Sequence, residues 1–206
     1  MLLFACVFFM GSFGMNFAVT TALMATEEFG KGAGEFGLLG SIMAIGSLAG
    51  ALLAARRQAP RLRFIVGAAL CFSALQVVSA LMPTYVTYAA VLPLVGLSVL
   101  TAVTTANALI QMSTAPAMRG RVASLYLMVF LGSVPLGAPL IGWLGEAFGP
   151  RWALAASGLG VGIGVTLAAI WFMRQDAPIR DALSRRRRGR RGQPPVPAPH
   201  ETIDLA

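Results

Sequence analysis

Polar side chains recur at helical spacing inside two strongly apolar segments of this sequence. In the first segment, Ser12, Asn16 and Thr20 follow one another at intervals of four residues. The second segment carries a larger set, whose members recur at spacings of three, four and seven residues: Thr101, Thr104, Thr105, Asn107 and Gln111. Because each residue of an α-helix advances by about 100°, each set covers one face. Amide side chains are costly to hold in hydrocarbon without water or a partner, so these faces predict a polar cavity or substrate path.

The same pattern has a second interpretation, which stays open. Polar side chains can join two membrane helices through hydrogen bonds, and a threonine can bond to a carbonyl of its own helix. The cavity interpretation is favoured for the three amides and is balanced against this alternative for the threonines. We assign the predicted transport cavity to five residues: Asn16, Thr20, Thr104, Asn107 and Gln111.

The sequence contains no residue pattern for enzyme catalysis, metal binding or a cofactor. The single histidine, His200, stands in a Pro-rich segment, and Cys6 and Cys71 lie alone inside apolar segments. Residues 158–164, GLGVGIG, resemble a nucleotide-binding loop in spacing only, because they follow no predicted strand. We interpret these glycines as sites of close helix packing. We therefore expect a protein that is not an enzyme and that uses no metal or cofactor.

The apolar character of the chain predicts its class. Of its 206 residues, 57% are hydrophobic and 12% are charged, which is about half the charged fraction of a soluble domain. No Asp, Glu, Lys or Arg occurs between Arg63 and Arg119, a stretch long enough for two membrane spans. We predict an all-α, polytopic protein of the lipid bilayer, with a transmembrane bundle at residues 1–173. The bundle should contain six transmembrane helices, at about 1–25, 36–55, 64–82, 86–112, 122–144 and 152–173.

The distribution of charge predicts how these helices cross the membrane. Arginine near a span resists translocation, so four arginines of the predicted loops should be cytoplasmic: Arg56, Arg57, Arg119 and Arg121. Both termini then lie in the cytoplasm as well, and of the 16 basic residues only Lys31 and Arg151 fall outside. The tryptophans and tyrosines fall near predicted span ends, as in an aromatic belt: Tyr85, Tyr88, Tyr126, Trp143, Trp152 and Trp171.

Residues 174–206 differ in composition from the rest of the chain. They are basic, then Pro-rich, and offer almost no apolar surface to bury. This composition predicts a disordered cytoplasmic tail. Its arginines are typical of an anchor at the membrane surface beside a last span, so we do not predict a nucleic-acid partner.

Two segments of the sequence are similar to each other at the predicted second and fifth helices. Residues 45–53 read IGSLAGALL, and residues 131–140 read LGSVPLGAPL. Each would be the second helix of a three-helix unit, and the two units would run in opposite directions, as inverted repeats do. The fifth helix also carries residues that a membrane tolerates better than water does: Gly132, Pro135, Gly137, Pro139 and Gly142.

Four strings of this sequence resemble a known family. They are GMNFAVTTALMA (14–25), FGLLGSIMAIGSLAGALLAAR (36–56), MRGRVASLY (118–126) and GSVPLGAPLIG (132–142). On these strings, residues 1–173 resemble spans seven to twelve, the C-terminal half, of a major facilitator superfamily transporter. The branch they resemble is that of the bacterial drug and siderophore exporters, which includes the enterobactin exporter.

The resemblance implies a fold and a function. It implies six helices in two inverted three-helix repeats, with the first and fourth helices lining a central cavity. It implies secondary active export of a drug-like or siderophore-like small molecule across a bacterial inner membrane by alternating access. Residues 132–142 fall where the family repeats its antiporter glycine–proline motif. Residues 50–63 look like a degenerate copy of its cytoplasmic basic-loop motif, without the aspartate.

The resemblance also implies a partner, because it covers only half of the family's twelve spans. We expect an N-terminal transporter half, encoded elsewhere or lost through a truncated gene or a misassigned start. A second copy of the chain is one alternative. A non-transporting membrane scaffold with a lipid-binding basic tail is another, although such a scaffold would not need the polar faces. The uncharged cavity favours neutral or amphipathic substrates.

Overall fold

The structure, a computed structural model, describes residues 2–56 and 62–191, with side chains up to Phe172 and that of Arg174. It divides into two compact units, Met1–Ala169 and Ile170–Ala206. Within the described residues, six helices are long and apolar enough to cross a membrane: Leu2–Glu28, Ala33–Ala55, Leu62–Ala80, Tyr85–Ser113, Pro116–Phe148 and Pro150–Phe172. The prediction of six membrane helices is confirmed, and the helix ends differ from the predicted ones by a few residues.

The first span is segmented. It consists of α1 (Leu2–Phe9), the π-helical turn η1 (Met10–Gly14), α2 (Phe17–Leu23) and a second π-helical turn, η2 (Met24–Glu28). A π-helical turn interrupts the regular hydrogen-bond ladder of an α-helix. The span ends at Glu28, three residues beyond the predicted end near residue 25, and the chain reverses at Gly30. The φ of +59° at Gly30 is one that glycine adopts without a steric penalty.

The remaining spans are more regular, because no π-helical turn interrupts their described residues. They are α3 (Ala33–Ala55), α4 (Leu62–Ala80), α5 (Tyr85–Ser113), α6 (Arg119–Phe148) and α7 (Pro150–Arg191). The hydroxyl of Thr84 accepts a hydrogen bond from the Thr87 amide and so caps the start of α5. Pro135 and Pro139 lie inside α6 without ending it, as expected of a membrane helix.

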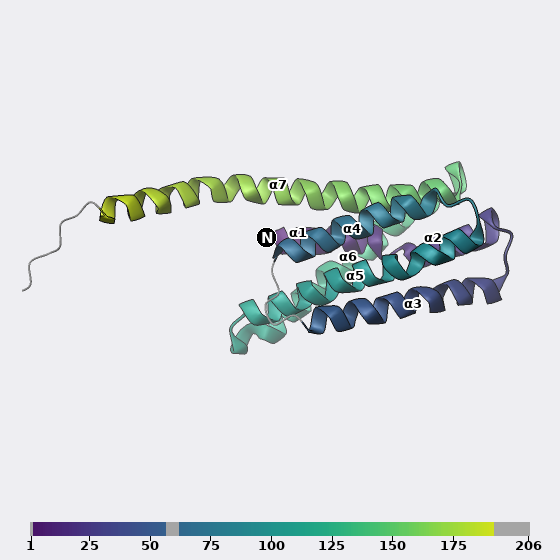
Figure 1. Ribbon diagram of the computed structural model, residues 1–206, viewed down its shortest axis with the longest axis horizontal. Helices are drawn as coiled ribbons and strands as arrows, with labels where there is room; N and C mark the ends of the chain where they lie inside the picture. The colour runs from purple at the N-terminus through teal and green to yellow at the C-terminus, as the bar shows by residue number, and fades with distance from the viewer. Residues whose placement is uncertain (1, 57–61, 192–206) are drawn as a thin grey trace, which may run out of the picture. The chain divides into compact units, whose positions relative to one another are not determined.

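Helix α5 lies between α3 and α4 in the first unit (Figure 1). Its contact with α3 depends on small residues. A Cβ added at Gly96 of α5 would overlap the Met43 carbonyl and would lie 2.7 Å from the Ser47 hydroxyl oxygen. In turn, a Cβ at Gly50 of α3 would overlap the Leu97 carbonyl. The two backbones therefore approach more closely than larger residues would permit.

The first span crosses α6 in the same manner. A Cβ at Gly11 of η1 would overlap the Phe130 carbonyl and the Ser133 hydroxyl. A Cβ at Gly137 of α6 would overlap the Ser12 carbonyl. At each crossing a glycine of one helix faces a serine of the other: Gly11 faces Ser133, and Gly96 faces Ser47. The residue after that glycine faces a second glycine: Ser12 faces Gly137, and Leu97 faces Gly50.

The two crossings reveal an internal repeat. Gly11 and Ser12 contact α6 in the way that Gly96 and Leu97 contact α3. The two pairs are 85 residues apart in the sequence, so a shift of 85 residues relates the first span to α5. Under this shift the burial class of residues 10–28 matches that of 95–113 at 13 of 19 positions. Helix α3 runs back after the first span, and α5 lies parallel to α3, so the equivalent helices run in opposite directions. The inverted three-helix repeats predicted from the sequence are present.

The glycines of residues 158–164 pack α7 against two neighbours. A Cβ at Gly158 would lie 2.8 Å from the Cβ of Gln76 in α4, and one at Gly162 would overlap the Ser73 hydroxyl. Gly160 instead faces the Phe13 ring of the first span. The interpretation of these glycines as close helix packing, and not as a nucleotide-binding loop, is confirmed.

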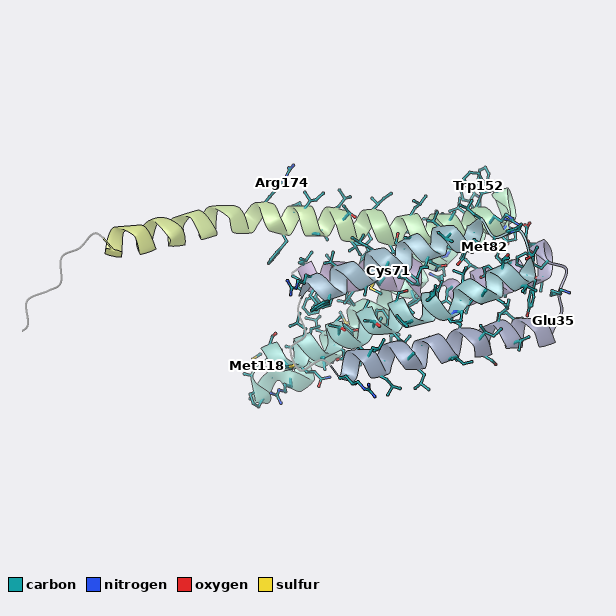
Figure 2. The ribbon with its side chains drawn as sticks, viewed as in Figure 1. Glu35, Cys71, Met82, Met118, Trp152 and Arg174 are labelled. Atoms are coloured by element: carbon teal, nitrogen blue, oxygen red, sulfur yellow. The ribbon has the colours of Figure 1, made fainter. Side chains whose placement is uncertain are left out.

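The two ends of the first unit carry different loops. Glu35, Met82 and Trp152 lie at one end, and Met118 lies at the other (Figure 2). Arg119 and Arg121, predicted to form a turn, instead occupy the first turn of α6. The chain turns before them, through the short helix η3 (Pro116–Met118), because proline fits the first position of a helix. Arg56 follows the end of α3, and Arg57 lies outside the described residues.

Two further expectations need correction. Tyr88 and Tyr126 are buried, with 0% and 3% exposure, so they belong to the interior and not to an aromatic belt. Trp143, Trp152 and Trp171 are exposed, as a belt requires. In addition, α7 continues to Arg191 where we predicted a disordered tail from residue 174, since its Arg, Ala and Leu residues are good helix formers. Residues 192–206 lie outside the described part.

Candidate functional site

The accessible polar side chains of α5 lie near the end that holds Met118. Gln111 is exposed, and its Nε2 donates a hydrogen bond to Oδ1 of Asn107 at 3.0 Å. Asn107 and Thr104, one and two turns before it, are half-buried. After this bond each amide still has a free N–H, and the Gln111 carbonyl oxygen can accept. We call Thr104, Asn107 and Gln111 the polar face of α5; it is uncharged and can both donate and accept hydrogen bonds.

The other threonines of this stripe are buried against neighbouring backbone. The Thr101 hydroxyl donates to the Gly50 carbonyl of α3 at 3.3 Å, and the Thr105 hydroxyl donates to the Thr101 carbonyl at 2.6 Å. Both side chains are at most 7% exposed. For these two residues the packing interpretation is the right one, and only part of the predicted stripe is accessible.

In the first span, Asn16 and Thr20 do not share an accessible surface. Asn16 is 4% exposed, and its Nδ2 donates to the Ser12 carbonyl at 2.7 Å beside the break after η1. Thr20 is fully buried and donates to the Phe17 carbonyl at 3.0 Å. The close approach of α6 at Gly137 covers this side of the span. The placement does not support the prediction that these two residues line a cavity.

The glycine–proline segment of α6 divides between two sides of the helix. Gly137 faces the first span, whereas no atom lies within 4 Å of a Cβ added at Gly132 or Gly142. Pro135 and Pro139 are exposed on the same uncovered side. Because proline lacks an N–H, each leaves the carbonyl four residues earlier without its helical hydrogen bond. This side of α6 therefore presents small residues and free backbone carbonyls.

An ion pair lies at the end opposite Met118. Nε of Arg151 lies 2.8 Å from Oε1 of Glu28, and its Nη1 donates to the Ala80 carbonyl at 3.1 Å. This ion pair joins the end of the first span to the start of α7, across 123 positions of sequence. The sequence offered no signal for it. Within the described part of the chain, no group of three or more His, Cys, Asp or Glu residues could hold a metal ion.

Six membrane helices in inverted repeats, with an uncharged polar face on the fourth, define a multi-pass membrane protein with a helical transporter architecture. The family model of the Major Facilitator Superfamily matches residues 2–201. The chain therefore belongs to the major facilitator superfamily, whose members are membrane transporters and not enzymes. No protein with a curated description and no solved structure matches it.

Proposed function

We propose that this chain is one half of a secondary active transporter that exports a small molecule across a bacterial inner membrane by alternating access. The observation that carries the proposal is the polar face of α5, within a family of transporters. Two amides bonded to each other on an accessible side of a membrane helix do not join helices, and an amide that faces lipid is costly unless it meets water or a ligand. A substrate path gives them such a partner.

The proposed substrate follows from the chemistry of this face. Asn107 and Gln111 offer hydrogen-bond donors and acceptors, and the face carries no charge. It is therefore suited to an uncharged or amphipathic molecule, such as a drug or a siderophore-like compound.

The proposed mechanism requires a second six-helix bundle, because alternating access rocks two bundles about a central site. The uncovered sides of α3 and α6 support this requirement. No atom lies within 4 Å of a Cβ added at Gly37 or Gly40 of α3, or at Gly132 or Gly142 of α6. Small residues permit close helix contact, and the carbonyls freed by the α6 prolines would be costly against lipid. We propose that an N-terminal transporter half covers these sides.

Co-expression tests the proposal. The chain alone should give no export of toxic neutral or amphipathic compounds, whereas the chain with a matching N-terminal half should lower their accumulation in cells. In the pair, Asn107→Leu and Gln111→Leu should each reduce export without changing protein abundance, because neither leaves a buried polar group unpaired. Met112→Leu, at an exposed neighbouring position, is the matched control and should leave export unchanged.

The outcomes separate the competing functions. Export by the chain alone as a monomer would contradict the half-transporter proposal. Export by the chain alone as a dimer would identify the second bundle as another copy. If the chain binds anionic vesicles through its basic segment and no pairing produces export, the scaffold is the better description.

A further inference from the structure

The internal repeat identifies which side of the first span is equivalent to the polar face of α5. The shift of 85 residues was set by the contacts at Gly11 and Gly96, which are independent of the polar residues. It places Asn16 on Thr101 and Thr20 on Thr105, and all four are buried. The residues that the sequence suggested for a cavity in the first span are therefore equivalent to the packed side of α5.

The accessible residues of α5 have different equivalents. Thr104 corresponds to Val19, Asn107 to Ala22 and Gln111 to Thr26 under the same shift. Ala22 is half-buried like Asn107 and Thr26 is exposed like Gln111, whereas Val19, at 47% exposure, is more accessible than the half-buried Thr104. Spacings of three and four residues place Val19, Ala22 and Thr26 on one side of the helix.

We propose that Val19, Ala22 and Thr26 form the first span's side of the transport site, in place of Asn16 and Thr20. This inference rests on the proposed function and assigns residues to the same site. The side chains of Val19 and Ala22 have no hydrogen-bonding groups, and the Thr26 hydroxyl donates to the Ala22 carbonyl at 2.9 Å. The first span thus contributes a mainly apolar wall, whereas α5 contributes an amide wall.

The two walls also lie at different depths, because equivalent helices of an inverted repeat run in opposite directions. The wall of the first span lies towards the Glu28–Arg151 ion pair, and that of α5 lies towards Met118. A substrate that contacts both walls presents uncharged hydrogen-bonding groups towards one end of the bundle and apolar surface towards the other. The site is therefore matched to an elongated, amphipathic and uncharged molecule.

Cysteine accessibility tests this assignment without knowledge of the substrate. In the full chain co-expressed with its second bundle, Cys6 and Cys71 are first replaced by Ala. Val19→Cys, Ala22→Cys and Asn107→Cys are then compared with Thr20→Cys, which is buried, and Ile163→Cys, which lies on an exposed apolar side of α7. The probe is the charged reagent MTSET, which reaches a thiol only through water and reacts with its thiolate.

We expect Val19→Cys and Ala22→Cys to react as fast as Asn107→Cys, and Thr20→Cys and Ile163→Cys to react at least about tenfold more slowly. Reaction of Asn107→Cys without Val19→Cys and Ala22→Cys would overturn this inference and leave the proposed function intact. If Asn107→Cys is also unreactive, both the transport site and this inference fail. Immunoblots of each variant show whether the pair is assembled in the membrane.

Discussion

The first span and α5 are equivalent helices that use their polar residues differently. Both cross a neighbour at a glycine, and both bury the equivalent positions, Asn16 with Thr101 and Thr20 with Thr105. In the first span, however, the amide is on the packed side, whereas in α5 the amides are on the accessible side. Side-chain polarity alone therefore does not identify a cavity face; the position of the close helix crossing decides it.

The backbone gives a physical reason for this difference. The first span is interrupted by two π-helical turns, and Asn16 follows the first of them and donates to the Ser12 carbonyl. A buried polar side chain can repair a local irregularity of this kind, because an unsatisfied carbonyl is costly inside a membrane. Helix α5 is a single 29-residue helix without such a turn. Its amides are therefore not needed to bond a displaced carbonyl and are available for another partner.

The largest expected effect concerns the opposite orientation of the two repeats. Gly34 and Gly120 are matched probes, because no atom lies within 4 Å of a Cβ added at either. With Cys6 and Cys71 replaced by Ala, an impermeant maleimide added to intact cells should label Gly34→Cys and not Gly120→Cys, since the arginine-rich end should be cytoplasmic. Lysed cells are the control, in which both variants should be labelled; labelling of both in intact cells, or of neither after lysis, would mean that the reagent fails to report topology. Labelling of Gly120→Cys alone in intact cells would reverse the topology.

The next effect concerns the crossing that covers Asn16. Gly137→Ala would drive a methyl group into the Ser12 carbonyl, and a backbone moves less readily than a side chain. We expect a loss of folded protein corresponding to about 3 kcal/mol or more, the upper part of the range for overpacking. Gly132→Ala, five residues away on the uncovered side, is the control and should be tolerated. Thermal stability of the purified variants in detergent measures both; equal effects would mean that the crossing is not where the structure places it.

The sequence predicts the helices of this protein far better than it predicts their faces. Six spans follow from hydropathy, because each must satisfy its backbone within the bilayer. The side that each helix buries depends on its neighbours, which hydropathy does not report. Asn16 and Tyr88 illustrate this limit: an amide expected in a cavity and a tyrosine expected in a belt both lie in the interior, where the Tyr88 hydroxyl is 3.2 Å from that of Thr21. The polar face of α5 is accessible, and that it lines a cavity stays a prediction.

A smaller effect distinguishes the two buried equivalents. Asn16→Ala should lower the unfolding free energy by about 1 kcal/mol, because it removes a short hydrogen bond in the interior. Thr101→Val should cost about 0.5 kcal/mol, because its shape is retained and hydrogen bonds between membrane helices are weak on average. Asn107→Ala, on the accessible face, should leave stability unchanged. A large loss of stability for Asn107→Ala with none for Asn16→Ala would exchange the roles assigned to the two helices.

The smallest effect concerns a feature that the two repeats do not share. Glu28 is equivalent to Ser113 under the shift of 85 residues, so the ion pair with Arg151 has no acidic counterpart at the end of α5. The side chains of Arg151 and Glu28 are 35% and 30% exposed, and a pair this exposed contributes at most about 1 kcal/mol. Glu28→Gln should therefore lower stability by less than this amount, and high salt should reduce the difference from the parent chain. Arg151→Gln should cost more, because it also removes the hydrogen bond to the Ala80 carbonyl that holds the end of α4. A double-mutant cycle on the purified protein isolates the pair itself, and zero coupling energy at low salt would show that Arg151 acts through the Ala80 carbonyl alone.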